Sequence, residues 1–305
     1  MRNTLFLAFI LIGVVSAVRA SPSFIIIDDQ TGHILAAEGE NKKRQVASLT
    51  KIACAMVVLD WVSSTGGSLA SIATVPPQVF RVGGANPCNL QPGDRLSLRD
   101  LLYAAMMTSD NRAAYTLAHH VGRLLPNSQM LRPADNFTAQ MNALGRQLEM
   151  KRTLFLNPHG LDNLKSPPHS TAADLARLTR YAYRNSGFNF YVSQPAREIR
   201  IEDAAGKSRK FLLRNTNQLL GQEGIEGVKT GRTARAGDCL ILASSRSPQP
   251  ITVQGRQLAL PRRIIVVLLA SPNRFREGLQ LIQRGWNLHE RWSGQGRPIS
   301  KRSGL

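Results

Sequence analysis

The sequence predicts a mixed α/β fold, more narrowly of the α+β type, in which an antiparallel sheet is flanked by helices. Strand-like apolar runs lie near both ends of the 305 residues, and segments with helical periodicity lie between them. The chain shows neither an internal repeat nor a long Gly-, Ser- or Pro-rich linker. We therefore expect one main domain.

The first two strands are expected close to the N-terminus. Ser23–Asp28 is an apolar run typical of a buried strand, and the turn residues Asp29–Gly32 follow it. His33–Ala37 then has the composition of a returning strand. This pattern predicts an antiparallel hairpin.

Helical segments occupy the middle of the chain. The first is expected over Leu49–Val62, with Ser48 at its start. Ser97 precedes a helix over Asp100–Met107 in a capping pattern, and Arg112–Val121 resumes as helix after an interruption. Two apolar stripes at helical spacing are predicted to face the core: Phe137, Met141, Leu144 and Leu148, and then Leu175, Leu178 and Ala182.

The last third of the sequence turns to strands and closes with a helix. Cys239–Ser245 and Ile264–Ser271 are expected strands, joined by a polar loop that contains proline. The closing helix presents one apolar face, made of Phe275, Leu279, Ile282 and Trp286. Residues 293–305 are polar and basic, and we expect a frayed tail there.

Residues 1–20 have the plan of a secretory signal peptide. Arg2 precedes an apolar run over Leu5–Val15, and small residues follow, ending in Val18-Arg19-Ala20. A buried first helix is the alternative, and a membrane span would need about 20 apolar residues, more than this stretch offers. We therefore expect an exported protein that begins near Ser21 and works in the periplasm or at the extracytoplasmic face of the membrane.

The chain is strongly basic, with 39 Lys and Arg against 20 Asp and Glu and a formal charge of +19. Such a charge favours anionic partners. The sequence shows no helix-turn-helix, zinc finger or aromatic-basic RNA platform, which argues against nucleic acid. For an exported protein, the available polyanions are wall polymers and the anionic membrane surface.

Three cysteines are an odd number for an exported protein. Cys54 and Cys239 lie in apolar segments, where a free thiol behaves as a small hydrophobic group. Cys88 lies in a loop rich in Pro and Gly and is a candidate for pairing. None of the three has metal-ligand spacing with another Cys or with a His, so neither a metal nor another cofactor is expected.

Three short motifs carry the chemistry. Ser48 and Lys51 are one helical turn apart, which places a hydroxyl beside an amine. Ser109-Asp110-Asn111 and Lys229-Thr230-Gly231 follow in that order, and they supply a second hydroxyl and a cationic strand. A Ser-x-x-Lys alone is expected about once by chance in a chain of this length, but the ordered set is far more specific. It indicates acyl transfer through a serine ester.

Serine needs an adjacent base to act as a nucleophile, and Lys51 can serve only if its pKa falls. Burial and a neighbouring cation both lower the pKa of an amine, and Lys229 is the candidate for that cation. The start of the helix also offers a backbone N–H and a positive dipole to a developing oxyanion.

Other polar residues receive plainer interpretations. His119 and His120 stand at a helix end and are expected to be caps or buried ring donors, while His159 and His169 are expected to hold loops. Asp110 is expected to face solvent or to fix its turn. A Gly-x-Ser-x-Gly elbow does not accompany the six histidines, which argues against a Ser-His-Asp triad.

On these motifs the sequence resembles the penicillin-binding DD-peptidases of low molecular weight, which are D-alanyl-D-alanine carboxypeptidases and endopeptidases. The similarity covers about Ser23–Trp286. Further matching segments are Val57–Asp60, Asp100–Ala104, Asn157–Asp162, Ser170–Leu175, Asn215–Asn217 and Gly227–Gly231.

The resemblance implies a β-lactamase/transpeptidase-like fold over residues 21–292, with the active site in a cleft between a five-stranded antiparallel sheet and an all-helical part. Its implied catalytic residues are Ser48, Lys51, Ser109 and Asn111, and its implied substrate-binding residues are Lys229, Thr230, Gly231 and Arg232. By this resemblance Ser48 is the nucleophile and Lys51 takes its proton. Ser109 relays protons to the leaving D-alanine, and Asn111 holds Lys51 and the substrate amide.

The same resemblance implies which residues bind the C-terminal end of the substrate and which groups form the oxyanion hole. Lys229 and Thr230 meet its terminal carboxylate, and the N–H groups of Ser48 and Arg232 form the oxyanion hole. Arg232 departs from the family, which more often has His, Tyr or Phe after the glycine. A guanidinium at that position could strengthen carboxylate binding, and the backbone role needs no particular side chain.

The function expected from the resemblance is a serine D-alanyl-D-alanine carboxypeptidase of peptidoglycan stem peptides, with β-lactam antibiotics as acylating inhibitors. An endopeptidase that cuts D-alanyl cross-links is the alternative. Three features resemble the endopeptidases: the short chain, Asn111–Ala114 and Ala118–His120. In contrast, His159–Asp162 resembles the carboxypeptidases. A β-lactamase would need a deacylating glutamate, and no Glu-x-x-x-Asn stands between the second and third motifs. A non-catalytic wall-binding protein is the third class.

Overall fold

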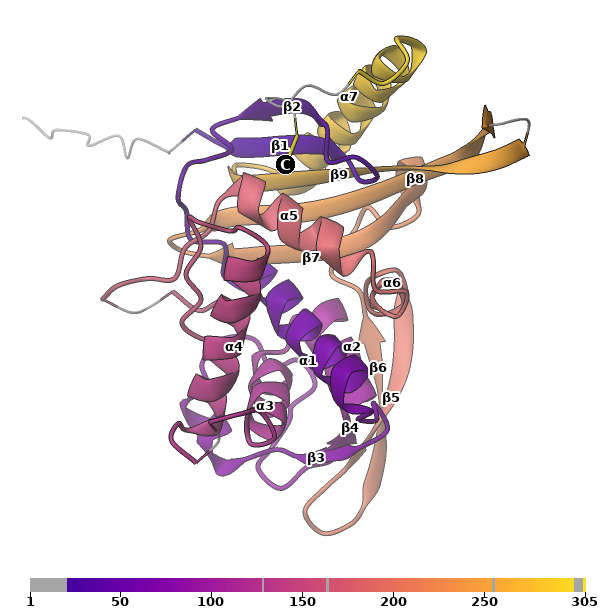
Figure 1. Cartoon of the computed structure of the whole chain (residues 1–305). Coiled ribbons are helices and arrows are strands. Elements are labelled where there is room, and N and C mark those ends of the chain that lie inside the picture. The colour runs from indigo at the N-terminus through magenta and orange to yellow at the C-terminus, as the bar shows by residue number, and fades with distance from the viewer. Residues whose placement is uncertain (1–20, 128, 163–164, 254–255, 299–303) are drawn as a thin grey trace, which may run out of the picture.

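The structure, a computed structural model, describes residues 21–127, 129–162, 165–253, 256–298 and 304–305. It has two parts: a sheet with helices on both faces, and a mainly helical part that lies against the edge of this sheet (Figure 1). The predicted signal peptide, residues 1–20, lies outside the described residues.

Five strands form the larger sheet, and every neighbouring pair is antiparallel, as the resemblance implied. Their spatial order is β2 (Ile34–Glu38), β1 (Ser23–Asp28), β9 (Arg256–Ser271), β8 (Gly237–Val253) and β7 (Ile225–Thr233). The predicted hairpin is confirmed, because β1 pairs with β2. β7 is an edge strand, so one side of its backbone is open to a neighbour.

A helix covers each face of this sheet (Figure 1). α7 (Arg274–Gly294) packs so closely on one face that a Cβ at Gly278 would lie 2.7 Å from the Leu240 side chain. The predicted apolar face of this helix is confirmed, and its Trp286 is fully buried. α5 (Ala172–Ala182) covers the opposite face, and its predicted stripe is buried. Burial on both faces explains why β1 is apolar almost throughout.

The polar loop predicted between Cys239–Ser245 and Ile264–Ser271 is wrong, because β8 and β9 continue through it as a two-stranded ribbon. Arg246 pairs with Arg262, and Gln249 pairs with Leu260, beyond the covered part of the sheet. The ribbon is exposed and mixes Arg, Gln and Pro with single apolar residues such as Leu258, which is 49% exposed. The continuous apolar runs therefore end where burial ends, while the backbone pairing continues.

The helical part is built around α1 (Lys51–Thr65), whose first nine residues are all buried. The helices packed around it are α2 (Leu98–Met107), α3 (Asn111–Gly122), α4 (Pro133–Gln147) and α6 (Phe188–Val192). Length and hydropathy alone would allow Ala47–Thr65 to span a membrane, but 67% of its most apolar window is buried inside the molecule, as in the core helix of a folded domain. The regular helix also begins later than predicted, because Ala47–Thr50 forms a 3-10 turn, η1.

The part expected to be all-helical also contains a four-stranded sheet. Its strands, in spatial order, are β3 (Ile72–Thr74), β4 (Arg95–Ser97), β5 (Ala196–Glu202) and β6 (Ser208–Arg214). β5 and β6 are largely exposed and rich in charged residues, so they lack the apolar signal of a core strand. Two short 3-10 segments, η2 (Pro77–Arg81) and η3 (Gln222–Gly224), complete the elements.

The described residues after Trp292, 293–298 and 304–305, contact the rest of the chain. α7 continues to Gly294, and the Trp292 ring stacks on His33 with centroids 4.4 Å apart. Gly304 pairs with His33, and the Leu305 N–H donates to the Gly32 carbonyl at 3.1 Å. The last two residues therefore lie on the β1–β2 hairpin, which contradicts the prediction for them.

Candidate active site

The first motif lies at the junction of η1 and α1. Ser48 sits within the 3-10 turn, and Lys51 is the first residue of the regular helix. The Lys51 Nζ lies 3.0 Å from the Ser48 Oγ, so the predicted contact between hydroxyl and amine is present. Lys51 is 0% exposed, whereas Ser48 is half-buried and can meet a substrate.

Two acceptors fix the Lys51 amine from its other sides. Its Nζ donates to the Asn111 Oδ1 at 2.7 Å and to the His159 carbonyl at 2.9 Å. Neither oxygen can donate a hydrogen, so each requires an N–H from the amine. When Lys51 is neutral, both of its hydrogens are used there, and its lone pair is left facing the Ser48 hydroxyl. The amine is thereby held in the orientation that a base needs.

Burial supplies the low pKa that this role requires. It lowers the pKa of Lys51 from 10.5 to about 7, against the opposing charge of Asp110. The sequence predicted two causes, burial and the charge of Lys229; burial is confirmed as the main one, and Lys229 is not among the charges that act on Lys51. Burial also lowers the pKa of Lys229 well below its usual value, helped by the charges of Lys51 and Arg274. The two amines therefore share one poorly solvated region, and burial is the main cause for both.

The second motif forms the turn between α2 and α3. Ser109 is half-buried with a positive φ of 64°, and its hydroxyl makes no hydrogen bond within the described part of the chain. Asn111 is fixed on its second side because its Nδ2 donates to the Gly83 carbonyl at 2.9 Å. This bond also settles which end of the Asn111 amide faces Lys51.

Asp110 fixes the turn, which confirms one of its two interpretations. Its carboxylate accepts from the Ala113 N–H at 2.9 Å as the cap of α3, and from the Cys88 N–H at 3.1 Å. The alternative, exposure to solvent, is wrong, since Asp110 is 0% exposed. Cys88, the candidate for pairing, is buried and free, and so are Cys54 and Cys239.

The third motif runs along the edge strand β7 and faces η1. A Cβ on Gly231 would lie 3.1 Å from the Ser48 backbone nitrogen, so glycine permits this close approach. The Lys229 Nζ donates to the Thr230 carbonyl at 3.1 Å. The Arg232 side chain is 77% exposed and lies 3.5 Å from the Asp238 carboxylate, on the neighbouring strand. The structure thus brings Ser48, Lys51, Asn111 and Gly231 together directly. Lys229, Thr230 and Arg232 lie on the same strand as Gly231, and Ser109 lies in the same turn as Asn111.

Two further residues contact the candidate site, and sequence reasoning gave neither of them a role there. The Thr216 Oγ1 lies 2.8 Å from the Thr230 Oγ1 and donates to the Met107 carbonyl at 3.2 Å, so it joins the end of α2 to β7. His159 contributes its backbone carbonyl to Lys51. Burial and the Lys51 charge lower the pKa of the His159 ring to about 3, so the ring is neutral at physiological pH. Thr216 and His159 lie in Asn215–Asn217 and Asn157–Asp162, two segments that resemble the DD-peptidase family. That resemblance was the only sign in the sequence that they belong to the site.

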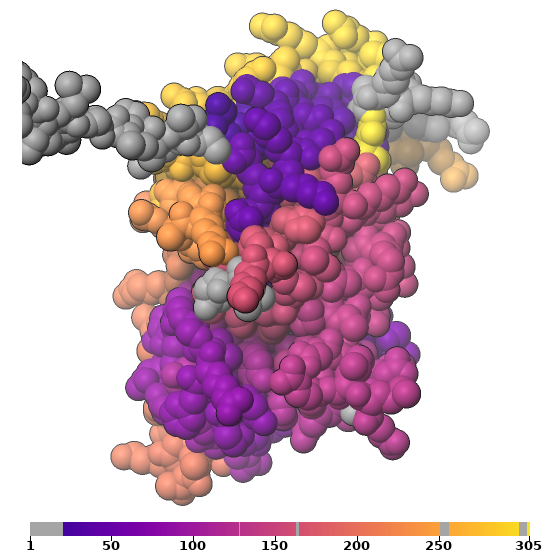
Figure 2. Space-filling view, turned by 90° about the vertical axis from the view of Figure 1, so that its left-hand side faces the viewer, coloured from indigo at the N-terminus to yellow at the C-terminus, as the bar shows by residue number. Residues whose placement is uncertain are grey.

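Gly160 allows the His159 loop to reach η1. Its φ is +88°, and a Cβ there would lie 1.9 Å from the Ala47 carbonyl oxygen. The Thr233 hydroxyl, at the end of β7, donates to the Asp162 carboxylate in the loop that follows Gly160. Figure 2 shows this face, where the pink loop before α5, the orange β7–β8 turn and the purple segment around η2 come together.

A serine held against a buried lysine, beside the edge strand of a five-stranded antiparallel sheet, defines an acyl-transferring serine enzyme of the β-lactamase/transpeptidase-like class. A sequence model of the D-alanyl-D-alanine carboxypeptidase family matches residues 14–253. The chain is 30% identical over 240 residues to the D-alanyl-D-alanine endopeptidase of Pseudomonas aeruginosa, which covers 77% of this chain and 70% of that relative.

Solved structures agree with the sequence comparison. The crystal structure of the Streptomyces K15 DD-transpeptidase matches with a TM-score of 0.73 at 26% identity, over 87% of this chain and 96% of that one. Penicillin-binding protein D2 of Listeria monocytogenes, in its ampicillin-bound form, matches with a TM-score of 0.67 at 25% identity and the same coverage, 87% and 96%.

The chain belongs to the D-alanyl-D-alanine carboxypeptidase family, which includes relatives named as endopeptidases. It is therefore an enzyme of the hydrolase class.

Proposed function

We propose that this enzyme removes the terminal D-alanine from peptidoglycan stem peptides through an acyl-serine formed at Ser48. The observation that carries the proposal is the 3.0 Å contact between the Lys51 amine and the Ser48 hydroxyl, with the other two positions around the amine occupied by acceptors. A neutral amine in that orientation can only receive the hydroxyl proton. A pKa of about 7 keeps a large fraction of it neutral at physiological pH.

Acylation begins when the Ser48 Oγ attacks the carbonyl carbon of the penultimate D-alanine and Lys51 accepts the hydroxyl proton. The N–H groups of Ser48 and Arg232 donate to the oxygen that gains negative charge. The peptide C–N bond then breaks, and Ser109 passes the proton to the leaving D-alanine amine. Water attacks the resulting ester with Lys51 again as base, which releases the shortened peptide and restores Ser48.

The substrate's terminal carboxylate is assigned to Lys229 and Thr230. A buried cation beside a hydroxyl is suited to a single carboxylate, because the charge is poorly screened there. Gly231 lets the strand approach the nucleophile. The Arg232 side chain already faces Asp238, so we assign Arg232 its backbone N–H.

Cleavage of D-alanyl cross-links is the second candidate, and the relative from Pseudomonas aeruginosa, an endopeptidase by name, favours it. The test is incubation with purified cross-linked and uncross-linked muropeptides, followed by mass analysis. Loss of one alanine from uncross-linked pentapeptides supports the carboxypeptidase. Conversion of dimers to monomers with pentapeptides left intact would replace it with the endopeptidase.

Assays with β-lactams distinguish two other classes of protein, a β-lactamase and a non-catalytic wall-binding protein. A stoichiometric burst of acylation is expected here, since the sequence lacks the Glu-x-x-x-Asn stretch of a deacylating enzyme. Steady hydrolysis of a chromogenic cephalosporin would indicate a β-lactamase. Folded protein that does not label at all would indicate a non-catalytic wall-binding protein.

We also propose that the catalytic domain spans residues 21–292 and that the protein is exported to the extracytoplasmic side of the membrane. Its formal charge, +17 once Arg2 and Arg19 leave with residues 1–20, favours anionic wall polymers or lipids there. N-terminal sequencing of protein secreted by the native host tests the first point. A mature start near Ser21 supports it, and a retained Met1 contradicts it. Salt-dependent sedimentation with purified cell walls tests the proposed binding to anionic wall polymers.

A further inference from the structure

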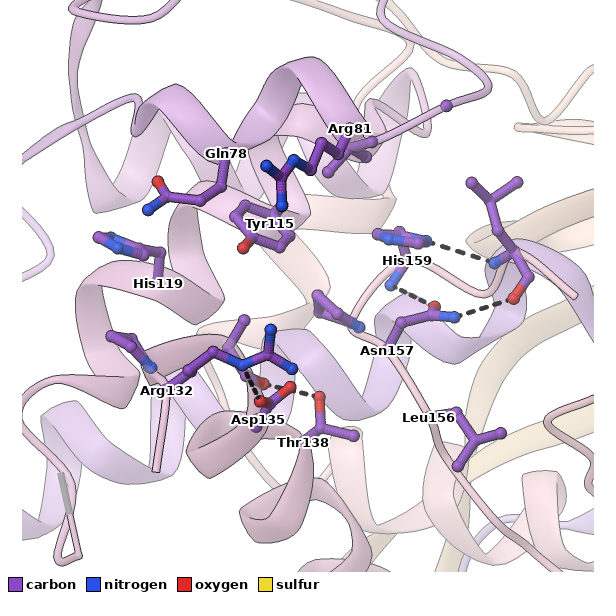
Figure 3. Close-up of a pocket in the computed structure, with 16 residues that line it drawn as sticks. Gln78, Arg81, Tyr115, His119, Arg132, Asp135, Thr138, Leu156, Asn157 and His159 are labelled. Carbon is purple, nitrogen blue, oxygen red and sulfur yellow. Dashed lines mark hydrogen bonds and ion pairs between the residues drawn. The ribbon is translucent and has the colours of Figure 1, made fainter. Parts of the chain in front are cut away.

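A cavity lies beside the candidate active site. It has a volume of about 520 Å³ and lies between η2, the side of α3, the start of α4 and the loop 156–161 (Figure 3). Gly83, His159 and Leu161 line it, whereas none of the four candidate catalytic residues does. On the face shown in Figure 2, it lies between the purple segment around η2 and the magenta α4.

The cavity carries one cation with no partner. Arg81 is exposed and forms no ion pair within the described part of the chain. Its charge acts on the Tyr115 hydroxyl, whose pKa is raised chiefly by burial. On the wall opposite, Arg132 is paired with Asp135 at 2.6 Å, so these two charges largely cancel (Figure 3). The net charge offered to a ligand is therefore that of Arg81.

The other lining groups are neutral. Burial lowers the pKa of His119 below its usual 6.5, so the ring is uncharged at physiological pH, and it stacks on Tyr115 with centroids 6.5 Å apart. The Tyr115 hydroxyl and the Asn157 and Gln78 side chains add polar groups, while Leu156 and the prolines add apolar surface. A ligand that fits this lining bears one carboxylate next to a carbon-rich peptide segment.

The cavity shares its wall with the catalytic residues. The Gly83 carbonyl accepts from the Asn111 amide at 2.9 Å, and the His159 carbonyl accepts from the Lys51 amine at 2.9 Å. A ligand seated against these two residues therefore lies one layer from Lys51. A peptide bound at Ser48 has its remaining length free to occupy a neighbouring site on the same face.

We propose that this cavity is a second substrate site, in which Arg81 binds a carboxylate of the peptidoglycan stem peptide other than its C-terminal one. The proposal rests on the function proposed above, because it assumes that a stem peptide is the substrate. It assigns Arg81 to substrate affinity and gives it no part in the acylation chemistry.

The test compares Arg81→Ala with Arg276→Ala, an exposed arginine on α7 at the far side of the sheet. The probes are a disaccharide-pentapeptide whose internal stem carboxylates are free and the same molecule with those carboxylates amidated. Arg81→Ala should raise the dissociation constant and KM for the free form about tenfold, the usual loss for one charge-assisted contact. It should leave the amidated form within about twofold, and Arg276→Ala should change neither.

Acylation by fluorescent penicillin separates the two proposals, since penicillin carries no stem peptide. Its rate should be equal in Arg81→Ala and the wild type. Unchanged affinity of Arg81→Ala for the free probe, or an equal loss for both probes, would overturn the second site. Absence of penicillin acylation in the wild type would instead overturn the proposed function, while direct binding of the probes still decides the role of Arg81.

Discussion

Acylation of Ser48 should follow the ionisation of Lys51. The perturbation is a change of pH from 9 to 5 during acylation by a fluorescent penicillin. With a Lys51 pKa of about 7, the amine is nearly all neutral above pH 8. At pH 5 only about one molecule in a hundred keeps a neutral amine, so the rate constant should fall roughly a hundred-fold from its plateau.

The shape of the profile is as informative as its size. An amine at its ordinary value of 10.5 would give a rate that still rises about tenfold between pH 8 and 9, whereas a pKa of about 7 gives a plateau there. The difference between the two values corresponds to roughly 5 kcal/mol between the charged and neutral forms. Burial of the Lys51 side chain is the main source of that energy.

The assay is stopped-flow fluorescence at each pH, with circular dichroism to show that the protein is folded across the range. A continued tenfold rise from pH 8 to 9 would refute the reasoning, because it would mean that burial does not lower the Lys51 pKa. A rate independent of pH from 5 to 9 would refute the assignment of Lys51 as the base.

Three further predictions test other contacts. Ser48→Ala should abolish penicillin labelling while the thermal midpoint changes little, because the hydroxyl has a single hydrogen-bond partner among the described residues, the adjacent amine. Residual labelling would move the nucleophile elsewhere. Thr216→Val removes the partner of the Thr230 hydroxyl, and should raise KM about tenfold for peptides with a C-terminal carboxylate but not for ester substrates without one. Hydrogen bonds from His289 and Thr31 outweigh burial and lower the pKa of Asp28 in the folded protein. The ionised carboxylate therefore stabilises the fold at any pH above its unfolded pKa, which is near 4. That stabilisation is lost as the pH falls through the lower pKa of the folded state. Asp28→Asn should therefore cost roughly 1–3 kcal/mol at pH 7 and flatten the loss of stability below pH 4, measured by urea titration; equal acid profiles would contradict this.

The sequence could predict those parts of the fold whose side chains are sorted by burial. The Ser23–Asp28 strand and the face of α7 both show regular apolar patterns, and both lie in the core. β5 and the outer part of β8 are held by backbone pairing with little burial, so composition carries no signal for them. The caps at Ser97 and Asp110 are local in sequence, which made the helix starts near them easier to place.

In the candidate site, too, some residues could be predicted from the sequence and others could not. Ser48, Lys51 and Asn111 are identifiable because their side chains define a motif. The partners that orient the amine include the His159 carbonyl, 108 residues away in sequence, and a backbone carbonyl is the same in every residue. Only the folded chain shows that this carbonyl points at Lys51.

The choice of lysine in the cleft follows from the same physics. The chain has 30 arginines and nine lysines, yet the two buried basic residues of the site, Lys51 and Lys229, are both lysines. Arginine keeps its charge even when buried, so it cannot act as a base, whereas burial readily lowers the pKa of a lysine. At Lys51 this neutral form is the useful one. At Lys229 an arriving carboxylate would restore the charge, because an anion beside the amine raises its pKa again. One burial effect therefore prepares the first amine to accept a proton, and it leaves the second able to regain its charge when substrate binds.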